Sequence, residues 1–260
     1  MECMVFQNRS PEESWLQTTW MSKYRFMNAL PESVDRVATR GILAKLNAEQ
    51  RSALLSSGHL SDAAAGELLY LAEDRPEFVG LIVEGFLRIF IADNSGREHT
   101  IRYVRPGDLV GVVAALSGPS PAWVQALRGS RIWLIDAAGL RRTAQSDIQI
   151  AWFIAEECAS RVAALVNEVI GSAFGTVRQR IAHHLLHMAQ SQSSAPYLMA
   201  HITQTDLANA AGTVREVCVR EIRFLRTKGL IRPGRDGIAI LDPDGLQRIA
   251  AKAFTPEYGT

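Results

Sequence analysis

Residues 202–222 read ITQTDLANAAGTVREVCVREI. Thr203 can cap a short apolar helix, and Gly212 permits a sharp turn after it. Thr213 is the predicted N-cap of a second helix that follows the turn. Two short helices joined by a glycine-containing turn are typical of the helix-turn-helix, whose second helix enters the DNA major groove.

The second of these helices has an apolar and a charged face. At helical spacing, the predicted inner face consists of Val214, Val217, Cys218, Ile222 and Leu225. Arg215, Glu216 and Arg220 are then left on the outer side, about one turn apart. Arginine donates two hydrogen bonds to guanine, and glutamate accepts one from cytosine. We therefore expect these three residues to contact bases. The alternative is an ordinary solvated helix face.

Polar residues near the two helix starts are suited to phosphate contacts, which fix the position of a protein on DNA. The predicted phosphate contacts are Thr203, Gln204, Thr205 and Thr213. Charge supports this prediction, because residues 174–260 contain 11 basic and 7 acidic residues, whereas residues 1–173 contain 17 and 20. Beyond residue 229, two apolar segments flank Pro233–Gly237 and predict a two-stranded wing, followed by a last helix.

Upstream, the chain contains short apolar segments separated by turn residues. They lie at residues 68–71, 78–83, 86–92, 100–104 and 132–135, and residues 93–96 read DNSG, a good hairpin turn. Short strands with such punctuation predict a β-sandwich or barrel.

One long helix is expected from about Asp147 to Gly171, with Gly171 and Gly175 ending it and forming a hinge. Its apolar seam recurs at heptad spacing and predicts a dimer interface: Ala151, Ala155, Cys158, Val162, Leu165 and Val169. A second stripe lies beside the seam: Ile148, Trp152, Ala159, Ala163, Val166 and Ile170. Two stripes suggest packing on the β domain and on a second copy. A monomer that buries both is the alternative.

Several classes of protein are disfavoured by composition. Charged residues nearly balance, with 28 basic and 27 acidic among 260. No segment has the length and apolarity of a membrane span or a secretory signal. The three cysteines are scattered, so we expect no disulfide framework, no metal site and a cytoplasmic location. We find no catalytic constellation and expect neither an enzyme nor a bound cofactor, although an enzyme or ligand-binding protein carrying a DNA-binding module is the rival class.

The order of these segments resembles the CRP/FNR family of bacterial transcription regulators, most specifically at residues 105–111, RPGDLVG, and at residues 202–242. The resemblance covers about residues 35–253. It implies an α+β fold with an N-terminal antiparallel β-roll of the jelly-roll type, a long dimerisation helix and a C-terminal winged helix-turn-helix. The corresponding domains are residues 1–34, a loosely ordered extension, then 35–146, 147–173 and 174–260.

The same resemblance implies the protein's partners. Members are homodimers that bind two-fold symmetric double-stranded DNA, and we expect RNA polymerase as a partner and a role as an activator. In cyclic-AMP-binding members an Arg-Glu pair, with an Arg four residues after the Glu, reads the bases. Arg215, Glu216 and Arg220 match that pattern.

The effector region departs from the cyclic-AMP-binding members. Their Gly-Glu pair corresponds to Gly111 and Val112, their Arg-Ser pair falls near Ser120, and their Thr-Ser pair falls on Leu165 and Val166. A cyclic phosphate needs a cation or amide cradle, and a ribose needs a polar partner. We therefore expect no cyclic-AMP binding in the usual mode. An unidentified, apolar effector and regulation without a ligand both stay open.

The cysteines and histidines bear on three other kinds of sensor: an iron–sulfur protein, a haem protein and a redox switch. An iron–sulfur cluster needs four cysteine thiolates, which three scattered cysteines cannot supply. His59 and His99 are weak candidates for haem ligands. A redox switch at Cys218 is the sharper alternative, because oxidation would place a polar group in the face that docks the second helix.

Overall fold

The computed structural model of the chain describes residues 30–251 apart from 74, 95, 97, 193–197 and 236. The expected extension, residues 1–34, therefore lies almost wholly outside the described residues. Helical structure begins earlier than the expected boundary at residue 35, because helix α2 spans Glu32–Arg40. Among the described residues, no helix combines the length and apolar character needed to cross a membrane.

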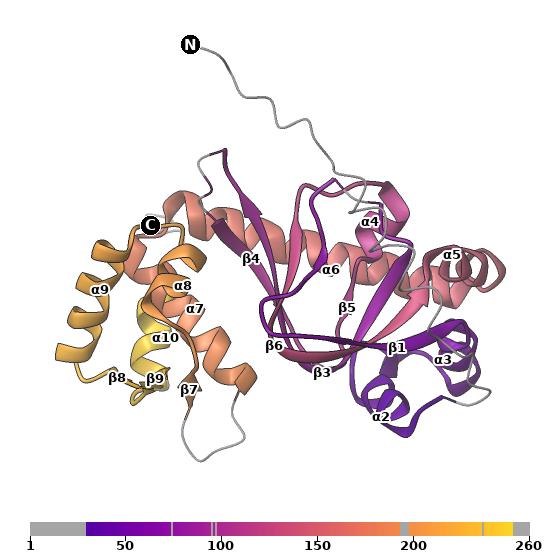
Figure 1. Cartoon of the computed structure of the whole chain (residues 1–260), viewed down its shortest axis with the longest axis horizontal. Helices are drawn as coiled ribbons and strands as arrows, with labels where there is room; N and C mark the ends of the chain where they lie inside the picture. The colour runs from indigo at the N-terminus through magenta and orange to yellow at the C-terminus, as the bar shows by residue number, and fades with distance from the viewer. Residues whose placement is uncertain are drawn as a thin grey trace, which may run out of the picture.

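The N-terminal domain is built around a six-stranded antiparallel sheet, in agreement with the predicted β-roll (Figure 1). Its two long strands, β3 (Phe78–Ala92) and β6 (Trp123–Asp136), pair along most of their length. Around them lie β1 (Gly58–Ala63), β2 (Leu68–Tyr70), β4 (Glu98–Val104) and β5 (Leu109–Val110). The predicted turn joins β3 to β4, with the Gly96 N–H donating to the Asp93 carbonyl at 2.9 Å.

Strand β3 is one bent strand where the sequence predicts two. Its pairing with β6 shifts register on both sides of Glu84. Gly85 has a φ of +103°, and a Cβ there would lie 2.5 Å from the Cα of Ser130. The glycine thus lets two paired strands approach closely at a bend, as in a β-bulge, and does not end the strand.

Short helices close the roll and supply part of its core. They are the 3₁₀ helix η1 (Ile42–Lys45), α3 (Ala48–Leu55), α4 (Val112–Ser117) and α5 (Ala137–Ser146). Their apolar residues pack with β3, β6 and the start of the long helix in one buried cluster.

The long helix α6 spans Ile148–Phe174 and runs along the sheet to the C-terminal domain (Figure 1). Asp147 caps it by accepting hydrogen bonds from two backbone N–H groups. The prediction that Gly171 ends the helix is wrong, because the helical hydrogen bonds continue through Gly171 and the C-cap is Gly175.

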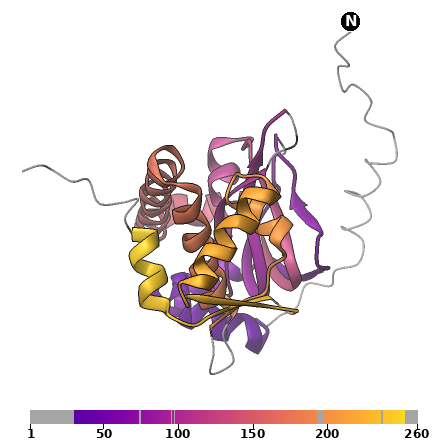
Figure 2. The ribbon, with the colours of Figure 1, turned by 90° about the vertical axis from the view of Figure 1, so that its left-hand side faces the viewer.

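The C-terminal domain is a helical bundle with a small three-stranded sheet. Its elements are α7 (Val177–Gln192), β7 (Met199–Ala200), α8 (Gln204–Ala210), α9 (Arg215–Thr227), β8 (Ile231–Gly234), β9 (Gly237–Ile240) and α10 (Pro243–Ala251). The β8–β9 hairpin is the predicted wing, and β7 adds a third strand that the sequence analysis missed. Seen from this end, the helices of the domain lie in front of the β-roll and the wing lies at their lower edge (Figure 2).

The two domains share a buried contact. Phe86 of β3 and Tyr103 of β4 stack with ring centroids 5.3 Å apart, and both belong to the core cluster of the C-terminal domain. The Tyr103 hydroxyl lies 3.4 Å from Nδ1 of the buried His184 on α7. The helix-turn-helix is therefore docked against the edge of the β-roll in this structure.

Candidate nucleic-acid interface

Helix α9 separates its apolar and charged residues much as its sequence predicts. Cys218, Ile222 and Leu225 are buried, and Val217 is half-buried. Val214 is the exception, because it is the N-cap of α9 and is 55% exposed. The N-cap residue precedes the first helical turn. The helical spacing that predicts an inner-face position for Val214 therefore does not apply to it.

The predicted base-contacting residues lie together on the outer face of α9. Arg215, Glu216 and Arg220 are all exposed. Arg215 and Glu216 open the helix, and Arg220 follows one turn later, on the same side as Glu216. Three polar, exposed side chains at the start of a helix that is anchored by its other face form a surface suited to base edges.

The turn before α9 differs from the prediction at one residue. The N-cap is Val214, which makes no side-chain cap, so the prediction that Thr213 caps this helix is wrong. Thr213 instead belongs to the turn, where its backbone N–H donates to the Ala208 carbonyl at 2.9 Å. Gly212 adopts the predicted turn conformation, with a φ of +58°.

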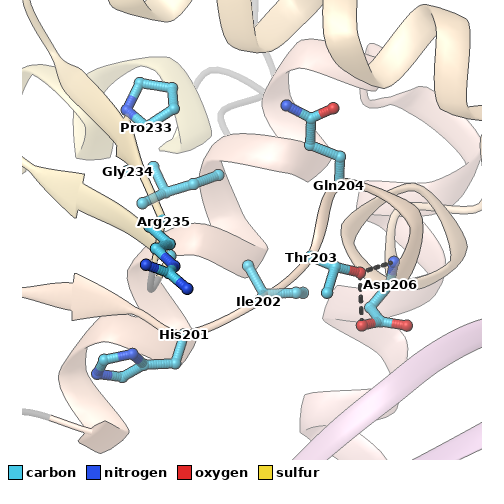
Figure 3. A pocket seen from close by; sticks show the side chains of 10 residues that line it. His201, Ile202, Thr203, Gln204, Asp206, Pro233, Gly234 and Arg235 are labelled. Atoms are coloured by element: carbon cyan, nitrogen blue, oxygen red, sulfur yellow. Dashed lines mark hydrogen bonds between the residues drawn. The ribbon is translucent and has the colours of Figure 1, made fainter.

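The start of α8 is capped as expected. The Thr203 hydroxyl accepts from the Asp206 backbone N–H at 3.1 Å and donates to the Asp206 carboxylate at 2.6 Å. Thr203 and Gln204 line a groove of about 390 Å³ whose opposite side is the wing at Pro233, Gly234 and Arg235 (Figure 3). The groove joins two of the predicted phosphate-contacting residues to an exposed arginine that the sequence analysis did not single out. Thr205 is exposed on the next position of α8.

An acidic residue of α9 that the sequence analysis passed over lies beneath Arg220. Glu221 is 6% exposed, and its carboxylate accepts from Nε of Arg178 at 2.7 Å and from Nε of Arg220 at 3.2 Å. Burial raises the pKa of this carboxyl group, but the hydrogen bonds and charges of the two arginines outweigh burial and hold the pKa below its usual value. Arg178, on α7, also stacks on Phe224, 3.5 Å from the ring centroid.

The expected seam of α6 is largely uncovered along its second half. Val162, Leu165 and Val169 are 61%, 46% and 57% exposed. The second stripe does not pack on the β-roll, since Ile148 and Trp152 are also well exposed. The face that does pack there consists of Ile150, Phe153 and Ile154, which neither stripe includes, together with the half-buried Cys158 of the seam. Most residues of both predicted stripes are therefore exposed in the single chain. This exposure disagrees with the alternative of a monomer that buries both stripes.

The residue at the centre of the expected effector region, Val112, is apolar and buried. Gly111 is the N-cap of α4 with a φ of +86°, and Val112 is buried in the core of the domain. Leu165 and Val166 are exposed on α6, and Ser120 is half-buried with its carbonyl accepting from the Glu73 N–H. Arg161 of α6, which the sequence analysis missed, donates to the Leu109 carbonyl at 2.7 Å. This contact places α6 near the turn at Gly111.

Known proteins match both parts of this architecture. Residues 61–147 match the family described as cyclic nucleotide-binding domain, and residues 179–249 match the Crp-like helix-turn-helix domain. The cAMP-activated global transcriptional regulator Vfr of Pseudomonas aeruginosa is 27% identical over 186 residues, which cover 68% of this chain and 87% of Vfr.

Solved structures agree with the fold. A putative transcriptional regulator of the crp/fnr family from Eubacterium rectale superposes with a TM-score of 0.67 at 22% identity, covering 80% of this chain and 97% of that one. FixK2 from Bradyrhizobium japonicum gives a TM-score of 0.64 at 22% identity, covering 74% and 96%. The two domains match known families in this order along the chain. The similarity to Vfr and the shared fold agree with those matches. The chain belongs to the CRP/FNR family of helix-turn-helix transcription regulators.

Proposed function

We propose that this protein is a homodimeric, sequence-specific DNA-binding regulator that reads bases with the start of α9. One observation carries the proposal: Arg215, Glu216 and Arg220 are exposed together on a helix whose opposite face is buried. Base readout needs this arrangement, because the side chains must reach the groove while the helix stays anchored. Such a regulator would act in the cytoplasm, where bacterial DNA lies.

Dimerisation would join two such surfaces. The exposed seam around Val162, Leu165 and Val169 is apolar and has heptad spacing, which is the pattern of a helix that pairs with a copy of itself. Two copies of α9 related by a two-fold axis would read two half-sites on one face of the duplex. RNA polymerase is the partner that a family member acting as an activator would contact.

The test compares binding to DNA at several salt concentrations. Fluorescence anisotropy with a labelled duplex of random sequence should show affinity falling by about 0.9 decade per decade of salt for each neutralised phosphate. On a preferred sequence, Arg215→Ala should cost about 1–3 kcal/mol, because it removes contacts to one base pair. Arg36→Ala, a change to an exposed arginine of α2, is the matched control and should leave binding unchanged. Binding that ignores salt would contradict the proposal.

A second candidate is a regulator switched by a small molecule other than cyclic AMP. The observation in its favour is Arg161 of α6, whose buried Nε has no hydrogen-bond partner among the described residues although the side chain lies beside the Gly111 turn. Val112 argues against ribose binding there, because the position is filled by a buried apolar side chain. Regulation without any ligand is equally compatible with these residues.

Thermal unfolding separates these possibilities, since a ligand that binds the folded state raises the unfolding temperature. Cyclic AMP at millimolar concentration should leave the temperature unchanged. A small-molecule extract of cells that raises it for the wild type, but not for Arg161→Met, would support an effector near α6. A rise with cyclic AMP itself would overturn the expectation from Val112.

A further inference from the structure

Glu221 is a buried carboxylate with both oxygens engaged by arginines from two different helices. Oε2 accepts from Arg178 of α7 at 2.7 Å, and Oε1 accepts from Arg220 of α9 at 3.2 Å. The side chain of Arg220 nevertheless stays 71% exposed, whereas that of Glu221 is 8% exposed. The carboxylate therefore holds an outward-facing arginine from beneath.

The atom used in this contact is informative. A guanidinium has five N–H donors, and Glu221 engages Arg220 through Nε, at the root of the group. The two terminal nitrogens carry the remaining donors and can form the paired hydrogen bonds that guanine O6 and N7 accept. A contact at Nε thus restricts the rotamers of Arg220 without using the donors that a base requires.

The carboxylate is itself firmly held. Arg178 binds it from α7 and packs over the ring of Phe224, 3.5 Å from the centroid, so the anchor combines an ion pair with a cation–π contact. Burial of Glu221 removes it from competing water, which strengthens hydrogen bonds to charged partners. The contacts therefore link Phe224, Arg178, Glu221 and Arg220 in that order, and Glu221, with its side chain 8% exposed, is the most buried of the three charged groups.

We propose that Glu221 is a positioning residue that preorganises Arg220 and thereby sets the preference for guanine at one base pair of each half-site. The inference rests on the proposed function, because it requires Arg220 to face DNA. A preorganised side chain loses less freedom on binding than a mobile one, and it meets one base in one geometry. Glu221 itself would not touch the DNA.

The charge of Glu221 gives the proposal a distinctive signature. A carboxylate near a phosphate backbone repels DNA, so Glu221→Gln removes one negative charge beneath this face while also removing the hold on Arg220. Affinity for DNA of random sequence should stay equal or increase at low salt. Preference for guanine over other bases at the Arg220 position should fall by about 3- to 10-fold, the range expected from freeing one long side chain. A purely structural role would weaken both.

The experiment selects bound duplexes from a randomised pool and sequences them, using the full-length wild type, Arg220→Ala, Glu221→Gln and the double variant. Arg226→Gln, at an exposed position of the same helix, is the matched control. Thermal unfolding is recorded for each variant. If Glu221→Gln unfolds too easily, Arg178→Met removes the anchor instead and should give the same loss of guanine preference.

The outcomes distinguish the inference from the proposed function. We expect Arg220→Ala to abolish the preference at one symmetric position, Glu221→Gln to reduce it, and the double variant to match Arg220→Ala. If Arg220→Ala keeps the preference, base reading by Arg220 is wrong. If Arg220→Ala loses it but Glu221→Gln does not, or if Glu221→Gln weakens all sequences by one factor, the positioning role alone is overturned.

Discussion

Cys218 illustrates how burial decides the chemistry of a single residue. It is fully buried on the inner face of α9, and burial followed by the charge of Glu221 raises the pKa of its thiol to about 11. Peroxide oxidises the thiolate form, and a thiol with such a pKa is almost entirely protonated at neutral pH. Burial and the raised pKa both disfavour oxidation of Cys218 in this structure, and the redox switch stays a hypothesis to be tested.

The corresponding prediction concerns DNA binding after oxidation. Wild-type protein treated with peroxide at pH 7 should bind DNA as the untreated protein does, and Cys218→Ser should behave identically. Cys158→Ser controls for the half-buried cysteine of α6. Loss of binding by the treated wild type, but not by Cys218→Ser, would restore the redox hypothesis.

Residue-scale prediction succeeds where one local pattern decides the outcome. Helical spacing identifies the exposed Arg215, Glu216 and Arg220 and the buried Cys218, because side chains three and four positions apart share a face. Glu221 could not be identified in this way. Its burial depends on Arg178, which lies 43 positions earlier in sequence, and no local pattern pairs the two.

At the scale of elements, α6 presents an apolar seam that its own chain leaves open. We predict that Leu165→Glu converts a dimer to monomers, because the two-fold axis would bring two like charges together in an apolar interface. Sedimentation velocity measures the change. Ser160→Glu is the matched control, since residue 160 is exposed and lies about 200° around the helix from Val162. Equal sedimentation of wild type and Leu165→Glu would contradict a dimer built on this seam.

The elements that the sequence predicts well are those with strong periodicity or strong turn signals. Helix α6, the helix-turn-helix and the wing all have them, and all are present. Strand β1, with the sequence GHLSDA, carries too few β-branched or aromatic residues to be identified. The bend at Gly85 divides β3 in sequence but not in space, because the pairing with β6 continues across it.

At the scale of the whole molecule, histidines lie where the helix-turn-helix meets the β-roll. His99 of β4 lies 3.2 Å from the Glu168 carboxylate of α6, and His183 of α7 lies 3.8 Å from the same carboxylate. His184 is buried beside Tyr103, and burial, followed by the charges of His183, His99, His187 and Arg180, holds its pKa well below 6.5. A neutral His184 is therefore part of the domain contact.

This lowered pKa predicts how stability depends on pH. Below pH 6.5 His184 is protonated in the unfolded chain but stays neutral in the folded protein. The contribution of His184 to the free energy of unfolding is therefore full above pH 6.5 and declines below it. The loss is about 1.4 kcal/mol per pH unit until the folded pKa is reached. His183 and His187, whose pKa values are also lowered, act in the same direction.

Chemical unfolding between pH 7.5 and about 5 tests this contribution. His184→Asn should be less stable at neutral pH but should lose less stability on acidification than the wild type does. His201→Gln, at an exposed position, should follow the wild type. Parallel curves for wild type and His184→Asn would show that the buried histidine does not carry the effect.

Whether a dimer reads bases with α9 can be measured by selecting bound duplexes from a randomised DNA pool with purified wild-type protein and no added ligand. Such a dimer should enrich a palindrome with half-sites about one helical turn apart, about 10–10.5 base pairs between centres. Each half-site should contain a G·C pair that becomes unconstrained in Arg220→Ala. Enrichment of a single asymmetric half-site would contradict the dimer, and no enrichment at low salt, with or without a small-molecule extract of cells, would contradict base reading itself.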